Sequence, residues 1–384
     1  MIYRYEMLRK HYPNLYKKHA ARPVNDKKVV FIEVREAKIS DSFSLMYKRV
    51  QEQNRYEVHT HFLRSGFSKR KEYQHACEAM ITDIADAKYI FLNESSDVIA
   101  ALPMRKETIV TQLWHGCGAF KKFGMSTAEL IFGDDRKTLE KYPFHGNYTY
   151  VTVSAPEVAW AYEEAMSLED KKGVVVPTGI SRSDIFFDMD AKTEARKKLY
   201  DVVPQAKGKK VILYAPTFRG RVAKAKTPNA LDIAAFGDAL SKDYVLLFKL
   251  HPFVKKRTAI PEGYEDFAFD CTDDMSIEEL LFVADICISD YSSLVFEYSL
   301  FEKPMIFFAF DLDNYYDWRG FYYDYKEFVP GPIYTATEEM IDYIKHIDTK
   351  FDKQKVKQFR DKFMSACDGH ATERIMKLVF DGEK

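Results

Sequence analysis

Short hydrophobic runs alternate with longer amphipathic segments along nearly the whole chain. Val29–Val34 is short and largely apolar, which is typical of a strand buried on both faces of a sheet. Ser42–Gln53, which follows it, is predicted to be a helix. The same alternation predicts further strands in this half of the chain at Val58–Leu63, Tyr89–Asn93, Thr108–Leu113, Tyr148–Ser154 and Val174–Val176, with helices at Lys69–Ala87 and Pro156–Met166.

A charged stretch separates this series from a second one. Residues at about 188–209 hold few apolar side chains and include Pro204 and Gly208, which favours a connection between domains. The second series predicts strands at Val211–Tyr214, Val245–Leu250, Phe267–Asp270, Ile286–Ser289 and Met305–Phe310, helices at Leu231–Leu240, Ser276–Ala284 and Ser293–Phe301, and two more helices after Glu338 and Thr372.

Two successive strand–helix series predict two doubly wound, Rossmann-like domains, because parallel strands need helical crossovers that cover the sheet. Ligands of such sheets bind beyond the carboxyl ends of the strands, so we expect the site in a cleft between the two facing domains. The expected divisions are a basic N-terminal segment, 1–28; the first domain, 29–188; the second domain, 189–365; and a C-terminal helix, 366–384, packing back on the first domain.

The composition fits an ordinary globular chain of about two domains. Of 384 residues, 46% are hydrophobic and 30% are charged, which excludes a disordered or collagen-like chain. No apolar run approaches the roughly 18–20 residues of a transmembrane helix, and no secretory signal is expected at the start. Five cysteines without a CxxC pattern indicate a reducing cytosol rather than a disulfide scaffold or a zinc module.

The candidate chemistry lies just after the predicted strands. In the first half, Thr108–Leu113 runs into Trp114-His115-Gly116-Cys117-Gly118 and then Lys121-Lys122. His115 at a strand end is suited to a general base, since an unperturbed imidazole titrates near pH 6.5. A loop histidine that only caps the strand is the alternative. No local partner would activate Cys117 as a nucleophile, so a structural cysteine is favoured.

In the second half, Val211–Tyr214 is followed by Ala215-Pro216-Thr217-Phe218-Arg219, and an arginine there suits a bidentate phosphate contact. Lys249 and His251 are two residues apart at the next strand end and should share one face. A cation beside an imidazole would suit an anionic ligand. The alternatives are a solvated arginine and a histidine held in place by Pro252.

A strand–helix junction at Asp290-Tyr291-Ser292-Ser293 adds hydroxyl groups and free N–H groups at a helix start, which is an anion site. Simple N-capping is the alternative. Glu297, one turn into the helix, could reach a ribose hydroxyl or lie on a solvated face. Asp311-Leu312-Asp313 resembles a metal-binding DxD, although structural use of these carboxylates is favoured.

Taken together, these residues predict a site for a diphosphate-linked donor, with one imidazole on the opposite domain. Neither GxxxxGK[ST] nor a GxGxxG after the first strand occurs, so ATPase and NAD-dependent functions are not expected.

These motifs resemble the CDP-glycerol glycerophosphotransferases of teichoic acid synthesis, a family of primases and polymerases. The resemblance spans about 105–335 in family order and implies a GT-B fold. The motifs that carry it are Trp114-His115-Gly116 with Lys121-Lys122, Tyr214-Ala215-Pro216-Thr217-Phe218-Arg219, Lys249-Leu250-His251-Pro252, Ser289-Asp290-Tyr291-Ser292-Ser293 and Arg319-Gly320-Phe321-Tyr322.

The resemblance implies transfer of glycerol phosphate from CDP-glycerol to a hydroxyl of a polyprenyl-diphosphate-linked acceptor, releasing CMP. No cofactor is required, and a divalent metal is not indicated, because phosphoryl transfer depends mostly on positioning and electrostatics. His115 would be the base, and His251 would bind the diphosphate. The remaining candidates are Arg219, Lys249, Ser292 and Ser293 for the diphosphate, Pro216, Thr217, Asp290 and Glu297 for the nucleotide, and Gly116, Lys121, Lys122 and Arg319 for the acceptor.

Several alternatives stay open. CDP-ribitol could replace CDP-glycerol, capsule could replace teichoic acid, or a UDP-sugar transferase or epimerase could share the fold. The family commonly has Thr-Pro where this chain has Cys117-Gly118, which bears on the acceptor geometry. A long N-terminal region like that of some polymerases is not expected, because the length of the chain is closer to that of the family's primases and short transferases.

The net charge of −1 hides a basic start. Residues 1–28 hold eight Lys or Arg against Glu6 and Asp26, a net +6, which leaves −7 for the rest. Nucleic acid binding is therefore not expected, but a basic aromatic segment suits an anionic membrane surface. We expect a peripheral protein on the cytoplasmic face of the membrane, with Pro13 dividing the segment into two short helices. A helix that packs on the domain with a solvated basic face is the alternative.

Overall fold

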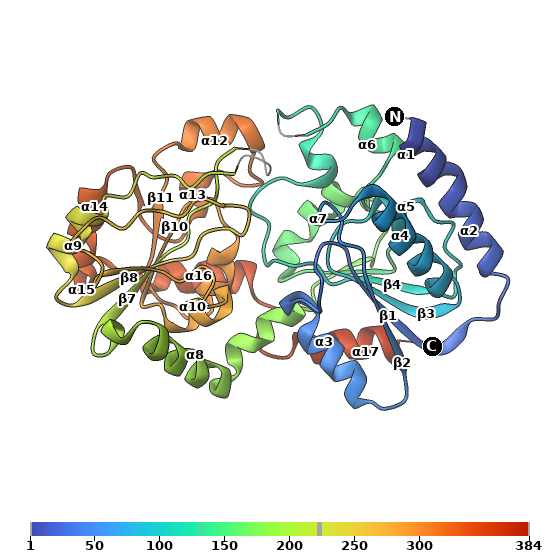
Figure 1. The fold of residues 1–384 in the computed structure, drawn as a ribbon, viewed down its shortest axis with the longest axis horizontal. Coiled ribbons are helices and arrows are strands. Elements are labelled where there is room, and N and C mark those ends of the chain that lie inside the picture. Colours follow the sequence, from blue (N-terminus) through green and yellow to red (C-terminus); the bar gives the residue numbers. More distant parts are fainter. Residues whose placement is uncertain (1, 132, 221–224, 383–384) are drawn as a thin grey trace. The chain divides into compact units, whose positions relative to one another are not determined.

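The computed structural model describes residues 2–131, 133–220 and 225–382, without the side chains of 2 and 316–319. The described chain forms two compact units (Figure 1). Unit 1 consists of Met1–Asp184 and Ser365–Lys384, and unit 2 is Ile185–Met364. Among the described residues, no helix combines the length and hydrophobicity needed to cross a membrane.

Unit 1 is built on one parallel six-stranded sheet with the order β2-β1-β3-β4-β5-β6. The order reverses between β1 and β3, and doubly wound sheets bind ligands at the carboxyl ends of the strands beside such a reversal. β4 is the next strand after β3 in this order. The strands are β1 (Asn25–Glu33), β2 (Glu57–Phe62), β3 (Ala87–Leu92), β4 (Ile109–Gln112), β5 (Tyr150–Thr152) and β6 (Val175–Val176).

Helices cover both faces of this sheet (Figure 1). On one face, α3 (Asp41–Glu52) and α17 (Ala371–Phe380) bury Phe43 and Phe380 against the strand residues Phe31 and Phe91. The C-terminal helix thus completes the core of unit 1. The remaining helices of unit 1 beyond the N-terminal segment are α4 (Arg70–Ile84), α5 (Asp97–Ala101), α6 (Arg136–Lys141) and α7 (Ala159–Met166), with short 3₁₀ turns at Gly124–Thr127 and Pro156–Val158.

Unit 2 repeats the plan with the sheet order β12-β11-β10-β7-β8-β9, again all parallel. Its order reverses beside β7, which brings the ends of β7 and β10 together. The strands are β7 (Lys210–Tyr214), β8 (Tyr244–Phe248), β9 (Ala268–Asp270), β10 (Ile286–Ser289), β11 (Met305–Phe308) and β12 (Ile333–Tyr334). The two doubly wound parallel sheets predicted from the sequence are confirmed.

The charged stretch after residue 188 is helical rather than a plain connection. It forms α8 (Met189–Val202), in which Ala195 and Leu199, four residues apart, are buried. This narrow stripe is enough to pack the helix on α10 (Ile277–Val283). The other helices of unit 2 are α9 (Ile233–Leu240), α11 (Leu294–Ser299), α12 (Leu312–Arg319), α13 (Tyr325–Phe328), α14 (Thr337–Lys345), α15 (Ile347–Lys350) and α16 (Lys353–Phe363), with 3₁₀ turns at Ser181–Phe187, which begins in unit 1, and Pro204–Ala206.

The N-terminal segment differs from its prediction. It is one continuous helical run of α1 (Ile2–Glu6), a π-helical turn (Met7–His11) and α2 (Tyr12–His19). The division at Pro13 is wrong, because the proline lies in the first turn of α2, where its missing N–H costs little, and the wider π turn precedes it. Leu8, Tyr12 and Tyr16 are buried, so the apolar face of the run packs on unit 1.

Candidate active site

His115 lies one strand away from the point at which the sheet order of unit 1 reverses. It follows β4 directly, after Leu113 and Trp114. The backbone of Trp114 is left-handed, with φ of 61°, and its N–H donates to Gln112 Oε1 at 3.1 Å. A bulky residue in this conformation is strained, and such strain is common where a loop must present a functional side chain. The Trp114 ring also stacks on the His115 ring at 4.5 Å.

The hydrogen bonds of His115 define its tautomer. Its Nδ1 lies 2.9 Å from the carbonyl oxygen of Asn93, just after β3. A carbonyl can only accept, so Nδ1 carries the proton and donates it. In the neutral ring, Nε2 is then an unprotonated acceptor. This is the tautomer that a general base needs, and the His115 side chain is exposed.

Desolvation by the surrounding protein disfavours the charged imidazolium and so lowers the pKa of His115 below its ordinary value of 6.5. Arg182 and Arg35 act in the same direction, while Glu94 and the hydrogen bond to Asn93 oppose it. His115 is therefore neutral at pH 7. Arg182 also donates from Nη1 to the His115 carbonyl at 2.8 Å, which fixes the peptide after the imidazole.

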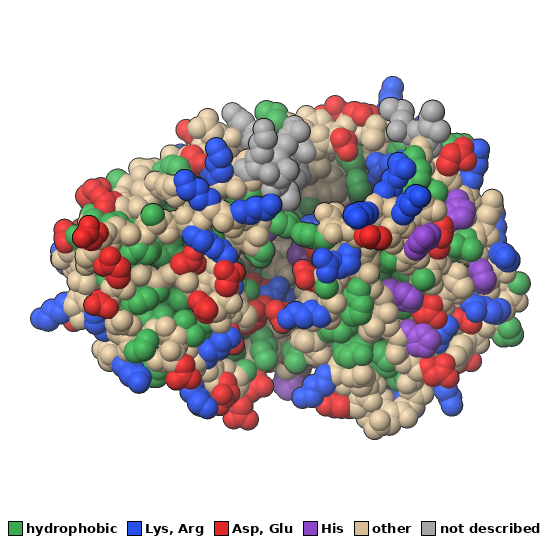
Figure 2. All heavy atoms as spheres, viewed as in Figure 1, with side chains coloured by type: hydrophobic (Ala, Val, Ile, Leu, Met, Phe, Trp, Pro, Cys, Tyr) green, Lys and Arg blue, Asp and Glu red, His purple; other side chains and the backbone are tan. Residues whose placement is uncertain are grey.

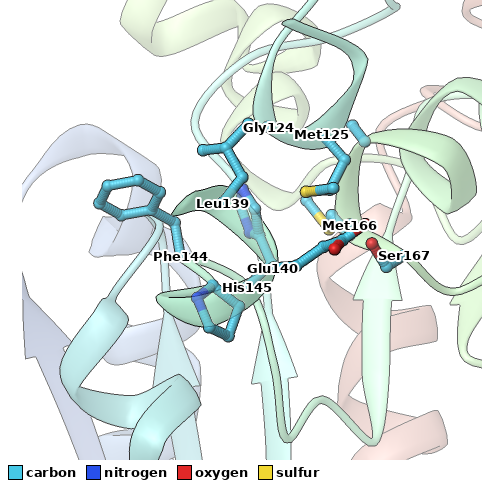
Figure 3. Close-up of a pocket in the computed structure, with 10 residues that line it drawn as sticks. Gly124, Met125, Leu139, Glu140, Phe144, His145, Met166 and Ser167 are labelled. Carbon is cyan, nitrogen blue, oxygen red and sulfur yellow. The ribbon is translucent and has the colours of Figure 1, made fainter. Parts of the chain in front are cut away.

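A second imidazole, that of His145, lies beside this loop. Burial and the neighbouring His115 lower its pKa to about 3. Its ring lies 5.8 Å from that of Trp114, and its Nδ1 lies 3.0 Å from the Tyr148 hydroxyl. His145 lines a largely apolar cavity of about 260 Å³ together with Met125, Leu139, Phe144, Met166 and others (Figure 3).

The acceptor-side candidates differ in burial. Gly116 is half-buried beside it, and Lys121 and Lys122 are half-buried a few residues further on. Cys117 is buried, which fits the structural interpretation. The backbone of Arg319 ends α12, but its side chain lies outside the described part of the structure. Gly116 follows His115 directly along the chain, and Lys121 and Lys122 come six and seven residues after it.

In unit 2, Asp290 joins the two strand ends at the point where the sheet order reverses. Its side chain is buried, and Oδ1 accepts from the N–H of Thr217 at 2.8 Å and from that of Tyr291 at 2.6 Å. Pro216, next to Thr217, is buried. The Thr217 hydroxyl is buried without a hydrogen-bond partner among the described residues, which marks it as a polar group available to a ligand.

Arg219 is held by carboxylates in this structure. It forms a bidentate pair with Asp311 through Nε (2.6 Å) and Nη2 (2.9 Å), and Nη2 also lies 2.9 Å from Asp290 Oδ2. The guanidinium lies over the Tyr291 and Tyr315 rings. Its first observable role is therefore to bind the strand-end loops together. Asp311, the first residue of the DxD, serves this pair and accepts from the Tyr291 hydroxyl.

Lys249 also points to protein atoms. It follows β8, and its Nζ donates to the carbonyls of Thr272 at 2.8 Å and Met275 at 2.6 Å. Burial lowers its pKa below 10.5. Lys249 therefore anchors the loop before α10.

His251 carries the opposite hydrogen-bond pattern to His115. Its Nδ1 accepts from the Phe253 N–H at 3.2 Å, so a neutral His251 ring holds its proton on Nε2. The ring packs against Phe218 at 4.8 Å and Phe253 at 4.5 Å. His251 can thus donate from Nε2 to a negatively charged oxygen.

The start of α11 is only partly used for capping. Ser293 has helical backbone angles and makes no side-chain cap, while Ser292 Oγ lies 3.4 Å from the Leu294 N–H. Glu297 is buried, so the solvated-face alternative is wrong for it. Both serines are half-buried at the end of β10 and lie near Asp290 in sequence.

No group of His, Cys, Asp or Glu side chains in the described ranges is arranged to hold a metal ion. The sequence singled out neither Asn93, which sets the tautomer of His115, nor Arg182 and His145. Asn93 could have been found as the first polar residue after a buried strand. Arg182 and His145 carry no such signal.

By fold, the protein is a two-unit α/β chain of the type seen in the wall teichoic acid polymerase TagF. That solved structure aligns with 98% of this chain and 95% of its own, with a TM-score of 0.77 at 23% identity. The expected GT-B architecture therefore stands on the fold.

The chain belongs to the CDP-Glycerol:Poly(glycerophosphate) glycerophosphotransferase family, whose model matches residues 14–381. The resemblance drawn from the motifs is confirmed. The teichoic acid poly(ribitol-phosphate) polymerase of Bacillus spizizenii strain W23 is 37% identical over 365 residues, 94% of this chain and 58% of the polymerase. The teichoic acid ribitol-phosphate primase of the same strain is 35% identical over 364 residues, 94% of this chain and 92% of the primase.

Proposed function

We propose that this chain transfers a polyol phosphate from a CDP-activated polyol to a hydroxyl of a polyprenyl-diphosphate-linked acceptor in teichoic acid synthesis, releasing CMP. The observation that carries the proposal is the tautomer of His115. A neutral imidazole with Nε2 unprotonated, at a strand end in this family, is equipped to deprotonate a hydroxyl.

The step balances as a phosphoryl substitution. The Nε2 atom of His115 takes the proton of the acceptor hydroxyl, and the oxygen attacks the β-phosphorus of the donor. The bond from that phosphorus to the oxygen bridging the two phosphates breaks, and CMP leaves with the bond's electron pair. His251 donates from Nε2 to a diphosphate oxygen and so stabilises the charge that moves onto CMP.

The other donor-side residues divide into contacts and supports. Ser293, whose side chain makes no cap bond, and Thr217, whose hydroxyl has no partner in the described part of the chain, are proposed to bind the donor directly. Ser292 is proposed to bind the diphosphate, and Pro216 and Glu297 to shape the nucleotide pocket. Arg219, Lys249 and Asp290 are proposed to act through the loops that they hold. Any direct contact between Arg219 and a phosphate is made while the arginine remains paired with its carboxylates.

For the polyol, CDP-ribitol is the proposed donor and CDP-glycerol the second candidate. The sequence motifs point to the family's CDP-glycerol, but both relatives described above are named for ribitol phosphate. The two donors share the diphosphate and cytidine, so the strand-end residues serve either one. Only side chains that contact the polyol can distinguish CDP-ribitol from CDP-glycerol.

A donor panel tests the proposal. Purified protein is given a synthetic lipid-linked acceptor with CDP-ribitol, CDP-glycerol or UDP-N-acetylglucosamine, and release of CMP or UDP is measured. We expect CMP release, fastest with CDP-ribitol. Faster turnover of CDP-glycerol would reverse the donor assignment, and UDP release without CMP release would contradict the function and favour a sugar transferase or epimerase. Mass spectrometry of the lipid product separates one added unit from many.

We further propose that the N-terminal helices bind an anionic membrane surface, where the lipid-linked acceptor resides. Tyr3 and Tyr5 are exposed, as are Lys17 and Lys18 on α2. Figure 2 shows Lys and Arg side chains in blue over the region that α1 and α2 occupy in Figure 1. Exposed aromatic rings and cations suit a headgroup layer.

Removing the segment would be a poor test, because Leu8, Tyr12 and Tyr16 belong to the core of unit 1. The double variant Lys17→Gln/Lys18→Gln avoids this. With about 1 kcal/mol per cation near an anionic surface, liposome binding should fall roughly thirtyfold. The exposed pair Lys171→Gln/Lys172→Gln, in the same unit, is the control and should bind as the unchanged protein does. Equal liposome binding by the two double variants would refute the proposal that the N-terminal helices bind an anionic membrane surface.

A further inference from the structure

The carbonyl that accepts the hydrogen bond from His115 Nδ1 belongs to Asn93, and the Asn93 side chain is itself held by hydrogen bonds. Asn93 is buried, and its Nδ2 donates to Glu33 Oε2 at 2.8 Å and to Ser40 Oγ at 2.9 Å. Its backbone oxygen meanwhile faces His115 Nδ1. Asn93 therefore joins the His115 imidazole to the buried carboxylate of Glu33.

Glu33 anchors the other end of this chain of hydrogen bonds. It is the last residue of β1 and is 1% exposed. Its Oε1 accepts from the Ser40 N–H at 2.6 Å, so both carboxylate oxygens are used. Burial raises the pKa of Glu33, while the bonds from Ser40 and Asn93 oppose that rise.

The placement follows from the sheet order. Because β1, β3 and β4 are neighbours, the residues at their carboxyl ends meet in one row: Glu33, Asn93 and His115. A buried carboxylate is costly unless it is hydrogen-bonded, and simple packing of β1 would be served by an apolar residue. A buried carboxylate at the end of β1 therefore indicates that Glu33 has a role beyond packing.

We propose that Glu33 and Asn93 are positioning residues for the reaction, fixing the carbonyl that holds the His115 proton on Nδ1 and so keeping Nε2 as the base. The inference rests on the proposed function. Neither residue needs to touch substrate, since both act through the imidazole. Partners that orient metal-binding histidines typically change affinity or activity by about tenfold to a hundredfold, and we expect an effect of that size here.

Other charged groups also face His115, so the test must separate them. Glu94 raises its pKa, and Arg182 and Arg35 lower it. None of these is changed in Asn93→Ala or Glu33→Gln. Because the bond to Asn93 raises the pKa of His115, loosening it should move the acid limb of the kcat/KM profile to lower pH.

The expected result for Asn93→Ala is a kcat lower by about tenfold to a hundredfold, a donor KM within twofold, and an acid limb displaced to lower pH. Glu33→Gln, which is isosteric and should fold even where Asn93→Ala does not, is expected to show the same changes to a smaller degree. Asn147→Ala is the matched control. Asn147 also ties a loop of unit 1 through two bonds, at 2.8 Å to Ile99 and 2.8 Å to Leu102, and should lose thermal stability without moving the limb.

Histidine ring ¹⁵N NMR of the unchanged protein and of Glu33→Gln reads the tautomer without any activity measurement. We expect an Nδ1–H form of His115 that is lost or mixed in the variant. An unchanged tautomer, together with an unchanged limb in both variants, would overturn the positioning role. Absence of CMP release by the unchanged protein would instead count against the proposed function, leaving the tautomer result to stand by itself.

Discussion

The two units place a histidine at similar points of similar sheets but surround it differently. In unit 1, a hydrogen bond to the backbone carbonyl of Asn93 holds His115 with its proton on Nδ1. In unit 2, the strand ends are held by the ion pairs of Arg219 with Asp290 and Asp311, and His251 accepts at Nδ1. The contrast shows that the partner of Nδ1, rather than the residue type, decides whether an imidazole can accept or donate at Nε2.

The largest effect should come from removing the accepting imidazole. His115→Ala is expected to lower kcat by about 10²–10⁴, because a positioned general base is worth that much. Donor affinity, measured by calorimetry, should stay within about twofold, since the proposed donor contacts lie in unit 2. Transfer that persists within about tenfold would show that His115 is not the base.

Removing the donating imidazole should act on binding as well. His251→Ala is expected to weaken donor affinity by about tenfold to a hundredfold, since a hydrogen bond to a charged group is worth about 1.5–3 kcal/mol. Turnover should fall too. Calorimetry with the CDP-polyol measures the donor Kd. An unchanged Kd would show that His251 does not bind the diphosphate, and the contrast with His115 would then fail.

The smallest effect should be on stability, and it compares the ion pairs of the two units. Asp311→Asn leaves the partly buried Arg219 without its bidentate partner and should lower the free energy of unfolding by about 1–3 kcal/mol. In unit 1, Glu6→Gln breaks an exposed pair with Lys10, which solvent screens, and should lower the free energy of unfolding by less. Urea denaturation measures both, and equal losses would remove the distinction.

Much of the architecture could be predicted because buried parallel strands are continuous apolar runs. The exceptions were short or sparse elements. β12 has two residues after Pro332, and α8 buries little more than Ala195 and Leu199, so neither stands out in a hydrophobic pattern. The helical run through Pro13 depends on a π turn, which no residue type encodes.

The sequence positions of the candidate site residues could be predicted, but their hydrogen-bond partners could not. Strand ends indicated His115, Arg219 and His251, but the carboxylate that holds Arg219 lies 92 residues away in sequence. The Asn93 carbonyl that orients His115 is backbone and has no sequence signature. Hydrogen-bond direction, and hence the division between accepting and donating histidines, needs the fold.

The pH dependence of kcat/KM reports the protonation state in which His115 acts. His115 must be neutral to act, and its pKa is lowered below 6.5, so activity should be full at pH 7 and fall as the pH drops through that lowered value. We predict an acid limb below pH 6.5 that is absent from the residual activity of His115→Ala. A limb at or above pH 6.5, or one that persists in that variant, would contradict it.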